Sequence, residues 1–324
     1  MKKAGLKSTV SICIIYLVFS TFLFGCNQLP DGKDYIHFDY NSFTQTLTIK
    51  GKGPLEYKDS VYYSITKIEA PKHIVISSGI TSVPDYYFEY DKEGNTGKDR
   101  NHFDEIESVK ISSTVTDIGD SAFGFCENLK EISIPDSVTV IGESAFHGCN
   151  SLHSVIVPDS VESIGVSAFA YCSSLEELSL PSDLAIISED LCNCCESLKS
   201  ITIPKSTTKI SSGAFHRCIK LASVTFNDKV TDIDECAFSH CPELTEISLP
   251  DTATNIGDMA FFCCSDIKSV TVPLSVKKIG TYAFGYSDSE DTTIKIKDFS
   301  IKGYKNSSAQ TYAQKNGFTF TELN

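Results

Sequence analysis

Basic residues are scarce in this sequence. It holds 28 lysines and arginines against 42 aspartates and glutamates, which gives a formal net charge of −14 over 324 residues. A nucleic-acid-binding protein needs a basic face to neutralise phosphates, and docking to anionic lipid needs a cluster of basic residues. The charge balance therefore argues against both kinds of partner.

The sequence also lacks an apolar run long enough for a comfortable membrane-spanning helix, which needs about 20 residues. Its longest uncharged, mostly apolar stretch is Val10 to Phe24, and Lys2, Lys3 and Lys7 precede it. A charged start followed by a short apolar core is typical of a secretory signal peptide. We therefore expect residues 1–25 to be such a signal.

The end of this stretch, Leu23-Phe24-Gly25-Cys26, resembles the bacterial lipobox, although Phe24 stands where a small residue is usual. The resemblance implies that Cys26 is lipidated and becomes the first residue of the mature chain, with residues 26–34 as a tether. The protein would then be exported and held at the cell surface by a lipid anchor in the membrane. Two alternatives stay open: a cleaved signal that releases a secreted protein, and an uncleaved N-terminal anchor.

Motifs of common enzyme classes are absent. The sequence contains no HExxH, no Walker A and no GxSxG motif. Its carboxylates are spread over positions that we expect to face solvent, such as Asp117, Glu143, Glu162 and Asp232, so no pair is singled out for acid–base catalysis. We expect a protein that is not an enzyme, with no cofactor, no metal and no small-molecule substrate.

What the sequence does contain is a repeat of 23 residues, a period typical of solenoid proteins. Proline occupies the same position of the repeat at six places: Pro135, Pro158, Pro181, Pro204, Pro250 and Pro273. Isoleucine follows six residues later in every repeat, at Ile118, Ile141, Ile164, Ile187, Ile210, Ile233, Ile256 and Ile279. An Ala-Phe pair follows in seven of the eight repeats, and Leu191-Cys192 replaces it in the fourth.

Each repeat can be assigned to local structures. The segment Ile132-Ser133-Ile134-Pro135 alternates apolar and polar residues and ends in proline, which predicts a short half-buried strand. Ala145, Phe146, Cys149 and Leu152 recur at helical spacing, which predicts one or two helical turns on the back. No unit buries its apolar face alone, so the fold class is an α/β repeat solenoid with a parallel sheet face.

The repeat pattern resembles the BspA-like leucine-rich repeats of bacterial surface proteins, and the match is close over residues 109–287. We place the regular repeats at 109–290. A degenerate first repeat occupies 71–108 and includes a charged insertion near Asp91 to His102. For some members the resemblance implies adhesion, or binding to host proteins such as those of the extracellular matrix.

The resemblance also implies a cap at each end, because an open solenoid end exposes its core. Residues 35–70 would form an N-terminal hairpin cap, with strands around Phe38 and Thr46 to Gly51. Residues 291–324 would form the C-terminal cap, with a helix from Ser307 to Asn316.

Thirteen cysteines in an exported chain suggest disulfides, but seven of them share one position of the repeat: Cys126, Cys149, Cys172, Cys195, Cys218, Cys241 and Cys264. We expect these seven to be reduced and buried like small hydrophobic residues. Cys192 takes a phenylalanine position and belongs in the core. The pairing state of Cys192, Cys194, Cys236 and Cys263 stays open.

Two further groups of residues bear on metal chemistry. Cys192-Asn193-Cys194-Cys195 contains a CxxC motif, so a metal or redox protein that uses the Cys192–Cys195 cluster is a third, less favoured hypothesis. His147 and His216 lie three repeats apart and cannot share a metal, and His240 sits one position later in the repeat. We expect all three histidines to be exposed.

The candidate binding residues are the small polar residues that point outward from the predicted strands. They are Glu131, Ser133, Ser154, Glu177, Ser179, Ser200, Thr202, Ser223, Thr225, Glu246, Ser248, Ser269 and Thr271. One interpretation is an extended surface that binds a protein partner; the other is that strands simply tolerate these residues on their solvent side. The leading functional hypothesis is a lipid-anchored surface protein that binds proteins, and the alternative is a structural envelope protein without a specific ligand.

Overall fold

The structure is a computed structural model that describes residues 36–56, 70–88, 103, 105–289 and 292–324. The chain divides into two units, Met1–Asp34 and Tyr35–Asn324, and the second unit is the solenoid. The expected signal peptide, Cys26, the tether and the insertion near Asp91 to His102 lie outside the described residues.

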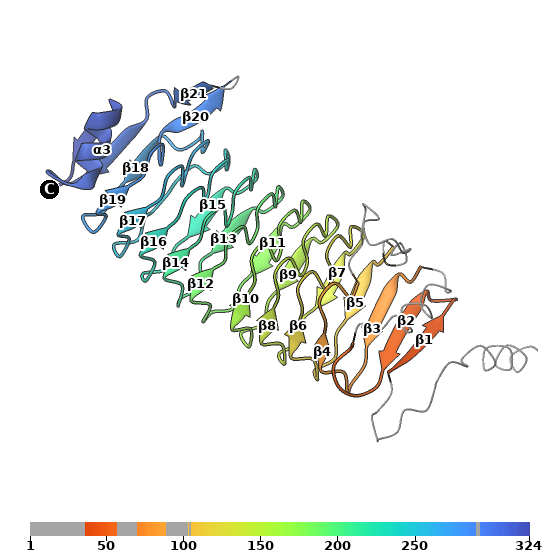
Figure 1. The fold of residues 1–324 in the computed structure, drawn as a ribbon. Helices are drawn as coiled ribbons and strands as arrows, with labels where there is room; N and C mark the ends of the chain where they lie inside the picture. The colour runs from red at the N-terminus through yellow and green to blue at the C-terminus, as the bar shows by residue number, and fades with distance from the viewer. Residues whose placement is uncertain (1–35, 57–69, 89–102, 104, 290–291) are drawn as a thin grey trace, which may run out of the picture. The chain divides into compact units, whose positions relative to one another are not determined.

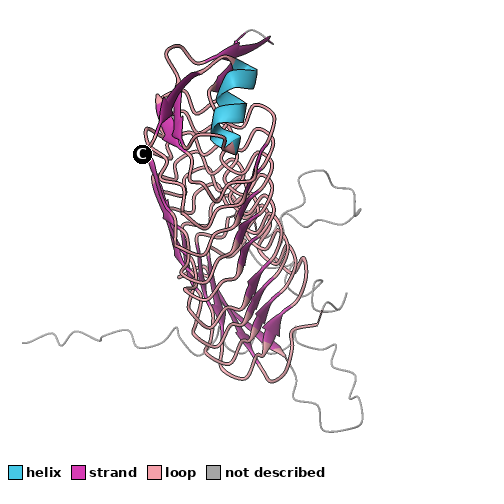
Figure 2. Ribbon diagram, turned by 90° about the vertical axis from the view of Figure 1, so that its left-hand side faces the viewer, coloured by secondary structure: helices cyan, strands magenta, loops and turns pink. Residues whose placement is uncertain are grey.

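Two sets of parallel strands run the length of the solenoid, as Figures 1 and 2 show. The first set is β2 (Thr46–Lys50), β3 (His73–Ile76), β5 (Ser108–Lys110), β7 (Glu131–Ser133), β9 (Ser154–Ile156), β11 (Glu177–Ser179), β13 (Ser200–Thr202), β15 (Ser223–Thr225), β18 (Ser269–Thr271), β22 (Ser300–Gly303) and β23 (Thr319–Glu322). The second set is β4 (Ser82–Val83), β6 (Asp117–Ile118), β8 (Val140–Ile141), β10 (Ser163–Ile164), β12 (Ile186–Ile187), β14 (Lys209–Ile210), β16 (Asp232–Ile233), β17 (Asn255–Ile256) and β19 (Lys278–Ile279). The predicted parallel sheet face is confirmed, and a second one accompanies it. In the described part of the chain, the first face is divided among four hydrogen-bonded sheets and the second between two.

A turn that begins at the proline connects the two strand sets within each repeat. The carbonyl of Pro158 accepts a hydrogen bond from the N–H of Val161 at 3.0 Å, and β10 follows directly. Proline cannot donate to a strand ladder, so the first strand ends there. Asn227 replaces proline in one repeat, and its side-chain oxygen accepts bonds from the N–H groups of Lys229 and Val230 instead.

The back of each repeat is not helical, so the prediction of helical turns is wrong. The N–H of Phe146 donates to the carbonyl of Ala168 in the next repeat at 2.9 Å, whereas an α-helix would use a carbonyl four residues earlier. Positive φ angles at Ser144 (55°) and Gly148 (71°) also interrupt any helix. The apolar spacing is that of successive tight turns, whose backbone groups pair between repeats.

The core is a set of side-chain columns that run along the solenoid axis. The phenylalanines stack in two runs, Phe88 to Phe169 and Phe215 to Phe284, with neighbouring ring centroids 5.2–5.5 Å apart. Cys192 stands between the runs and is fully buried. The seven cysteines that share one repeat position form a further buried column. Their thiols donate to the backbone carbonyl of the residue at the phenylalanine position in the preceding repeat, as Cys172 does to Phe146 at 3.2 Å.

Different structures terminate the solenoid at its two ends. At the start, β1 (His37–Asn41) pairs antiparallel with β2, which gives the predicted hairpin. At the other end, the antiparallel strands β20 (Tyr286–Ser289) and β21 (Thr292–Lys295) precede β22. Helix α3 (Ser308–Asn316), with Ser307 as its N-cap, then leads to β23. This is the helix that the sequence predicted.

Candidate functional site

The outward side chains of the first strand set form the candidate site, which we call the sheet face. Twelve of the thirteen predicted residues are exposed, and Ser269 is half-buried. Between them lie buried residues such as Val155, Leu178 and Ile201. This alternation follows from the two-residue period of a strand, which sends neighbouring side chains to opposite sides.

Strand register aligns equivalent side chains of the sheet face. Ser200 pairs with Ser223 and Thr202 with Thr225 in parallel strands, and Glu177 pairs with Ser154. Ile156 interrupts the polar surface: its side chain lies beside Ser179 in the register and is 75% exposed. The arrangement is a row of short hydroxyl side chains with widely spaced carboxylates and one exposed apolar residue.

Ion pairs line the edge of the sheet face, at the residues that precede the strands. Lys130 lies 2.7 Å from Glu107, and Lys199 pairs with Glu176 at 2.5 Å. The hydrogen bonds from these lysines lower the pKa of both glutamates. Both pairs join adjacent repeats, so these charges are partly satisfied within the protein and do not all face a ligand.

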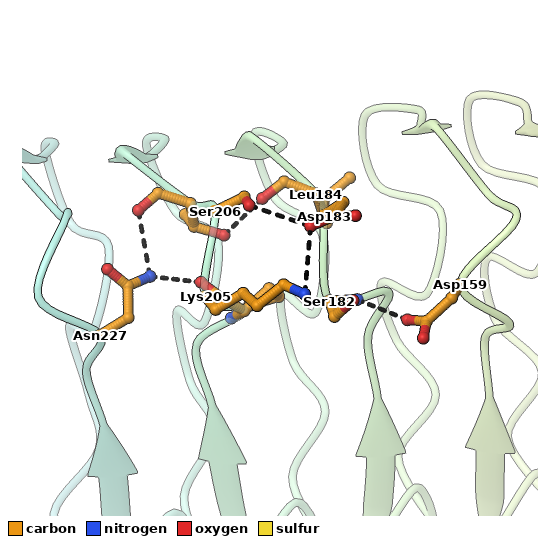
Figure 3. A network of polar contacts seen from close by, with 9 residues as sticks. Asp159, Ser182, Asp183, Leu184, Lys205, Ser206 and Asn227 are labelled. Atoms are coloured by element: carbon orange, nitrogen blue, oxygen red, sulfur yellow. Dashed lines mark hydrogen bonds and ion pairs between the residues drawn. The ribbon is translucent and has the colours of Figure 1, made fainter.

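The opposite edge of the sheet face carries a polar network on the turns that follow the prolines (Figure 3). The N–H of Ser182 donates to Asp159 at 2.7 Å, and the hydroxyl of Ser206 donates to Asp183 at 3.1 Å. Lys205 lies 3.6 Å from Asp183, and Asn227 donates to the carbonyl of Thr207. Because these bonds also join successive repeats, they hold the turns beside the sheet face in a fixed register.

The Cys192–Cys195 cluster does not have the geometry of a metal or redox site. Cys192 and Cys195 are fully buried, and the Cys195 thiol donates to the carbonyl of Phe169 at 3.1 Å. Burial raises the pKa of the Cys192 thiol well above its ordinary value, whereas a redox-active cysteine needs the thiolate. Among the described residues, no group of three metal-ligand side chains includes Cys192 or Cys195. The eleven cysteines in the described part of the chain are all free thiols.

The histidines are less exposed than expected. His147 and His216 are half-buried between the turns, and burial lowers the pKa of both. His240 is also half-buried, and the structure brings it together with Cys263 and Asp288. The sequence holds one signal of this cluster, since His240 and Cys263 are 23 residues apart; Asp288 belongs to a hairpin outside the repeat pattern.

Comparison with known proteins agrees with the repeat architecture. The family profile described as the BspA type leucine-rich repeat region matches residues 100–212 and 185–311, in six copies. The chain belongs to this family. A search of curated proteins gives no match.

Several solved structures are similar to this chain. The leucine-rich repeat protein of T. pallidum is 22% identical, with 72% of this chain and 88% of that chain covered and a TM-score of 0.42. A leucine-rich cell surface protein from Faecalibacterium prausnitzii is 19% identical, with 90% and 99% covered and a TM-score of 0.36. The pneumococcal vaccine antigen PcpA is 15% identical, with 91% and 98% covered and a TM-score of 0.37.

A search for membrane-spanning helices finds none among the described residues that is long and apolar enough to cross a bilayer.

Proposed function

We propose that this protein binds a protein partner through its sheet face while it is anchored at the cell surface. The observation that carries the proposal is the recurrence of exposed polar side chains at the same two positions of successive repeats, along one face of the solenoid from Glu131 to Thr271. Repeat solenoids use such extended surfaces for binding because each repeat adds contact area without changing the fold.

The chemistry of the sheet face suits a flat polar surface of a partner. Serine and threonine hydroxyls both donate and accept hydrogen bonds, and short side chains lose little conformational entropy when they are covered. Each polar contact contributes only about 0.5–1.5 kcal/mol, so affinity depends on many repeats at once. Ile156, 75% exposed among these hydroxyls, adds an apolar contact.

The test replaces three outward residues of successive strands by arginine: Ser179→Arg, Thr202→Arg and Thr225→Arg. The variant should fold normally, because all three side chains are exposed. It should lose binding to purified extracellular matrix proteins in a surface plasmon resonance panel, since bulky charges block close approach and are costly to desolvate.

The matched control introduces the same three charges on the second strand set. Val140→Arg, Ser163→Arg and Ile186→Arg change exposed residues of the successive strands β8, β10 and β12, and should leave binding intact.

If the first variant binds normally and deletion of residues 91–102 abolishes binding, the insertion is the binding site. If the wild-type protein binds none of the panel, the structural envelope role is favoured.

The proposed location rests on Leu23-Phe24-Gly25-Cys26 and has its own test. Cys26→Ala should move the protein from the membrane fraction to the soluble exported fraction, or leave an uncleaved precursor, because the lipid attachment point is gone. Mass spectrometry of the wild-type N-terminus should show an acylated cysteine. A mature chain without lipid would contradict the anchor and favour a secreted protein.

A further inference from the structure

Three side chains with metal-binding groups meet where the last regular repeats contact the C-terminal hairpin. The Nε2 atom of His240 lies 3.5 Å from one carboxylate oxygen of Asp288, and the Cys263 thiol donates to the other at 3.0 Å. The three potential ligand atoms all lie within 4.8 Å of one another. No other such group of three occurs among the residues that the structure describes.

The repeat geometry explains why His240 and Cys263 meet. They occupy the same position in adjacent repeats, on tight turns with φ angles of 61° and 60°. At this position the other repeats hold Phe125, Gly148, Tyr171, Cys194, Arg217 and Tyr286. A pair of adjacent metal-ligand side chains therefore arises only once in the regular array. The N–H of Cys263 donates to the carbonyl of Tyr286 at 2.9 Å, which places β20 and its Asp288 beside the two turns.

A buried serine orients the histidine. Ser239 is only 1% exposed, and its hydroxyl oxygen lies 2.8 Å from the Nδ1 atom of His240. The Nε2 atom is thereby left to face Asp288. Histidines that bind metals are commonly held in this way by a hydrogen bond to their second ring nitrogen, which fixes the ring and its tautomer.

We propose that His240, Cys263 and Asp288 bind a zinc ion through one nitrogen, one sulfur and one oxygen atom. Zinc accepts this ligand set, and tetrahedral bonds of about 2.0–2.3 Å place pairs of ligand atoms roughly 3.3–3.7 Å apart. His240 and Cys263 lie 3.5 Å and 3.0 Å from the two different carboxylate oxygens of Asp288. Because the three ligand atoms lie within 4.8 Å of one another, side-chain shifts of up to about an ångström bring them to this spacing. Three protein ligands leave the fourth coordination position to water.

The same three residues do not form a thiol-based catalytic centre. The Cys263 thiol donates to a carboxylate and not to the histidine, and burial together with this hydrogen bond raises its pKa to about 11. A catalytic cysteine needs the opposite shift. Zinc binding replaces the thiol proton, which is released to solvent, and the resulting thiolate, the neutral imidazole and the carboxylate then share the charge of the ion.

Zinc at this position would connect the sixth and seventh of the eight regular repeats to the hairpin of β20 and β21. The inference is independent of the proposed function, because the site lies on the turns of the back and shares no residue with the sheet face. It assigns a local binding site to a part of the molecule where the repeat pattern ends.

The test uses Co²⁺, which occupies zinc sites and absorbs light when a thiolate binds it. The purified full-length chain, freed of metal with a chelator, should bind one Co²⁺ per chain with a thiolate-to-cobalt charge-transfer band. Addition of Zn²⁺ should remove the band by competition. Cys263→Ser should abolish it, and Asp288→Asn, a change at an exposed residue that leaves the fold intact, should weaken Co²⁺ binding by at least about tenfold.

The control is Cys194→Ser, which removes a half-buried thiol at the same repeat position three repeats earlier. This variant should keep the full absorption band and the wild-type affinity. Absence of a charge-transfer band in the wild-type protein would overturn the zinc site. So would a band that survives Cys263→Ser or disappears in Cys194→Ser.

Discussion

Position 192 shows how the solenoid accommodates an irregular repeat at the level of single residues. Cys192 replaces the phenylalanine of the other repeats, and Leu191 replaces the neighbouring alanine; both are fully buried. The larger leucine offsets part of the volume that the ring would have filled, as volume-conserving exchanges in cores do. The Cys192 carbonyl still accepts a bond from the Cys218 thiol, so the cysteine column continues across the break.

The first prediction concerns the phenylalanine next to this break. Phe169 is fully buried and stacks on Phe146 with ring centroids 5.4 Å apart. Phe169→Ala should lower the free energy of unfolding by about 3–5 kcal/mol, because a buried aromatic leaves both lost transfer energy and a cavity. Denaturant titration followed by circular dichroism measures the effect.

Ile156→Ala serves as the control, because its side chain is 75% exposed on the sheet face and its loss should cost less than about 1 kcal/mol. Since each repeat contacts only its neighbours, the Phe169 variant should unfold first around the third repeat, which contains Phe169. Equal effects of the two substitutions would show that the Ala-Phe position is not part of the core.

At the scale of single residues, the sequence predicted burial better than it predicted sites. Periodicity identified the buried cysteines and the outward strand residues, since each recurs every 23 positions and stacking copies their environment. It did not reveal the partial burial of His147, which follows from the neighbouring rings of Phe125 and Tyr171. Nor could it place Asp288 beside Cys263, because the hairpin that carries it has no counterpart in the repeat.

At the scale of structural elements, the back of the repeat is where the sequence prediction failed. Apolar residues at Ala145, Phe146, Cys149 and Leu152 fit a helix, yet the same spacing fits successive tight turns. The two structures differ in their backbone hydrogen bonds: a helix bonds within itself, whereas here the N–H of Phe146 donates to the carbonyl of Ala168 in the next repeat. Among the described residues, the only helix is α3, whose nine residues follow the last repeat and have no further repeat to pair with.

The second prediction concerns the glycine that follows the second strand in most repeats. A Cβ atom on Gly165 would lie 2.3 Å from the backbone nitrogen of Glu143 in the preceding repeat. Gly165→Ala should therefore force the two repeats apart and destabilise the protein by about 1–3 kcal/mol, the usual cost of overpacking. The midpoint of thermal unfolding gives the measurement.

Ser211 provides the matched control, because it occupies the same position of its repeat and already carries a Cβ atom. Ser211→Ala should change stability by no more than about 0.5 kcal/mol. If Gly165→Ala is equally neutral, close approach between repeats is not the reason for glycine at this position.

At the scale of the whole molecule, the solenoid depends on structures that differ from the repeat at its ends. The sequence indicated both, because the alternating residues near Phe38 and the segment Ser307 to Asn316 break the 23-residue pattern. In the C-terminal cap, a side chain replaces the missing next repeat as a hydrogen-bond partner. The N–H of Phe261 donates to the carbonyl of Ala283 in the next repeat, whereas Phe284 has no next repeat to pair with. The hydroxyl of Tyr312 on α3 takes its place, accepting from the Phe284 N–H at 3.1 Å and donating to the Phe284 carbonyl at 3.0 Å.

The third prediction follows from this pair of hydrogen bonds between Tyr312 and the backbone of Phe284. Tyr312→Phe keeps the ring that packs against Phe284 but leaves a buried N–H and a buried carbonyl without their partner, at a cost of about 1–3 kcal/mol. Hydrogen-exchange mass spectrometry should show faster exchange at Phe284 and in the last repeat, and unchanged exchange near Phe123, because repeats couple mainly to their neighbours. Tyr304→Phe is the control, since Tyr304 enters the hydrogen bonds of the cap through its backbone carbonyl, to Ser307. Unchanged protection at Phe284 in the Tyr312 variant would mean that the packing of α3, and not its hydroxyl, closes the end of the solenoid.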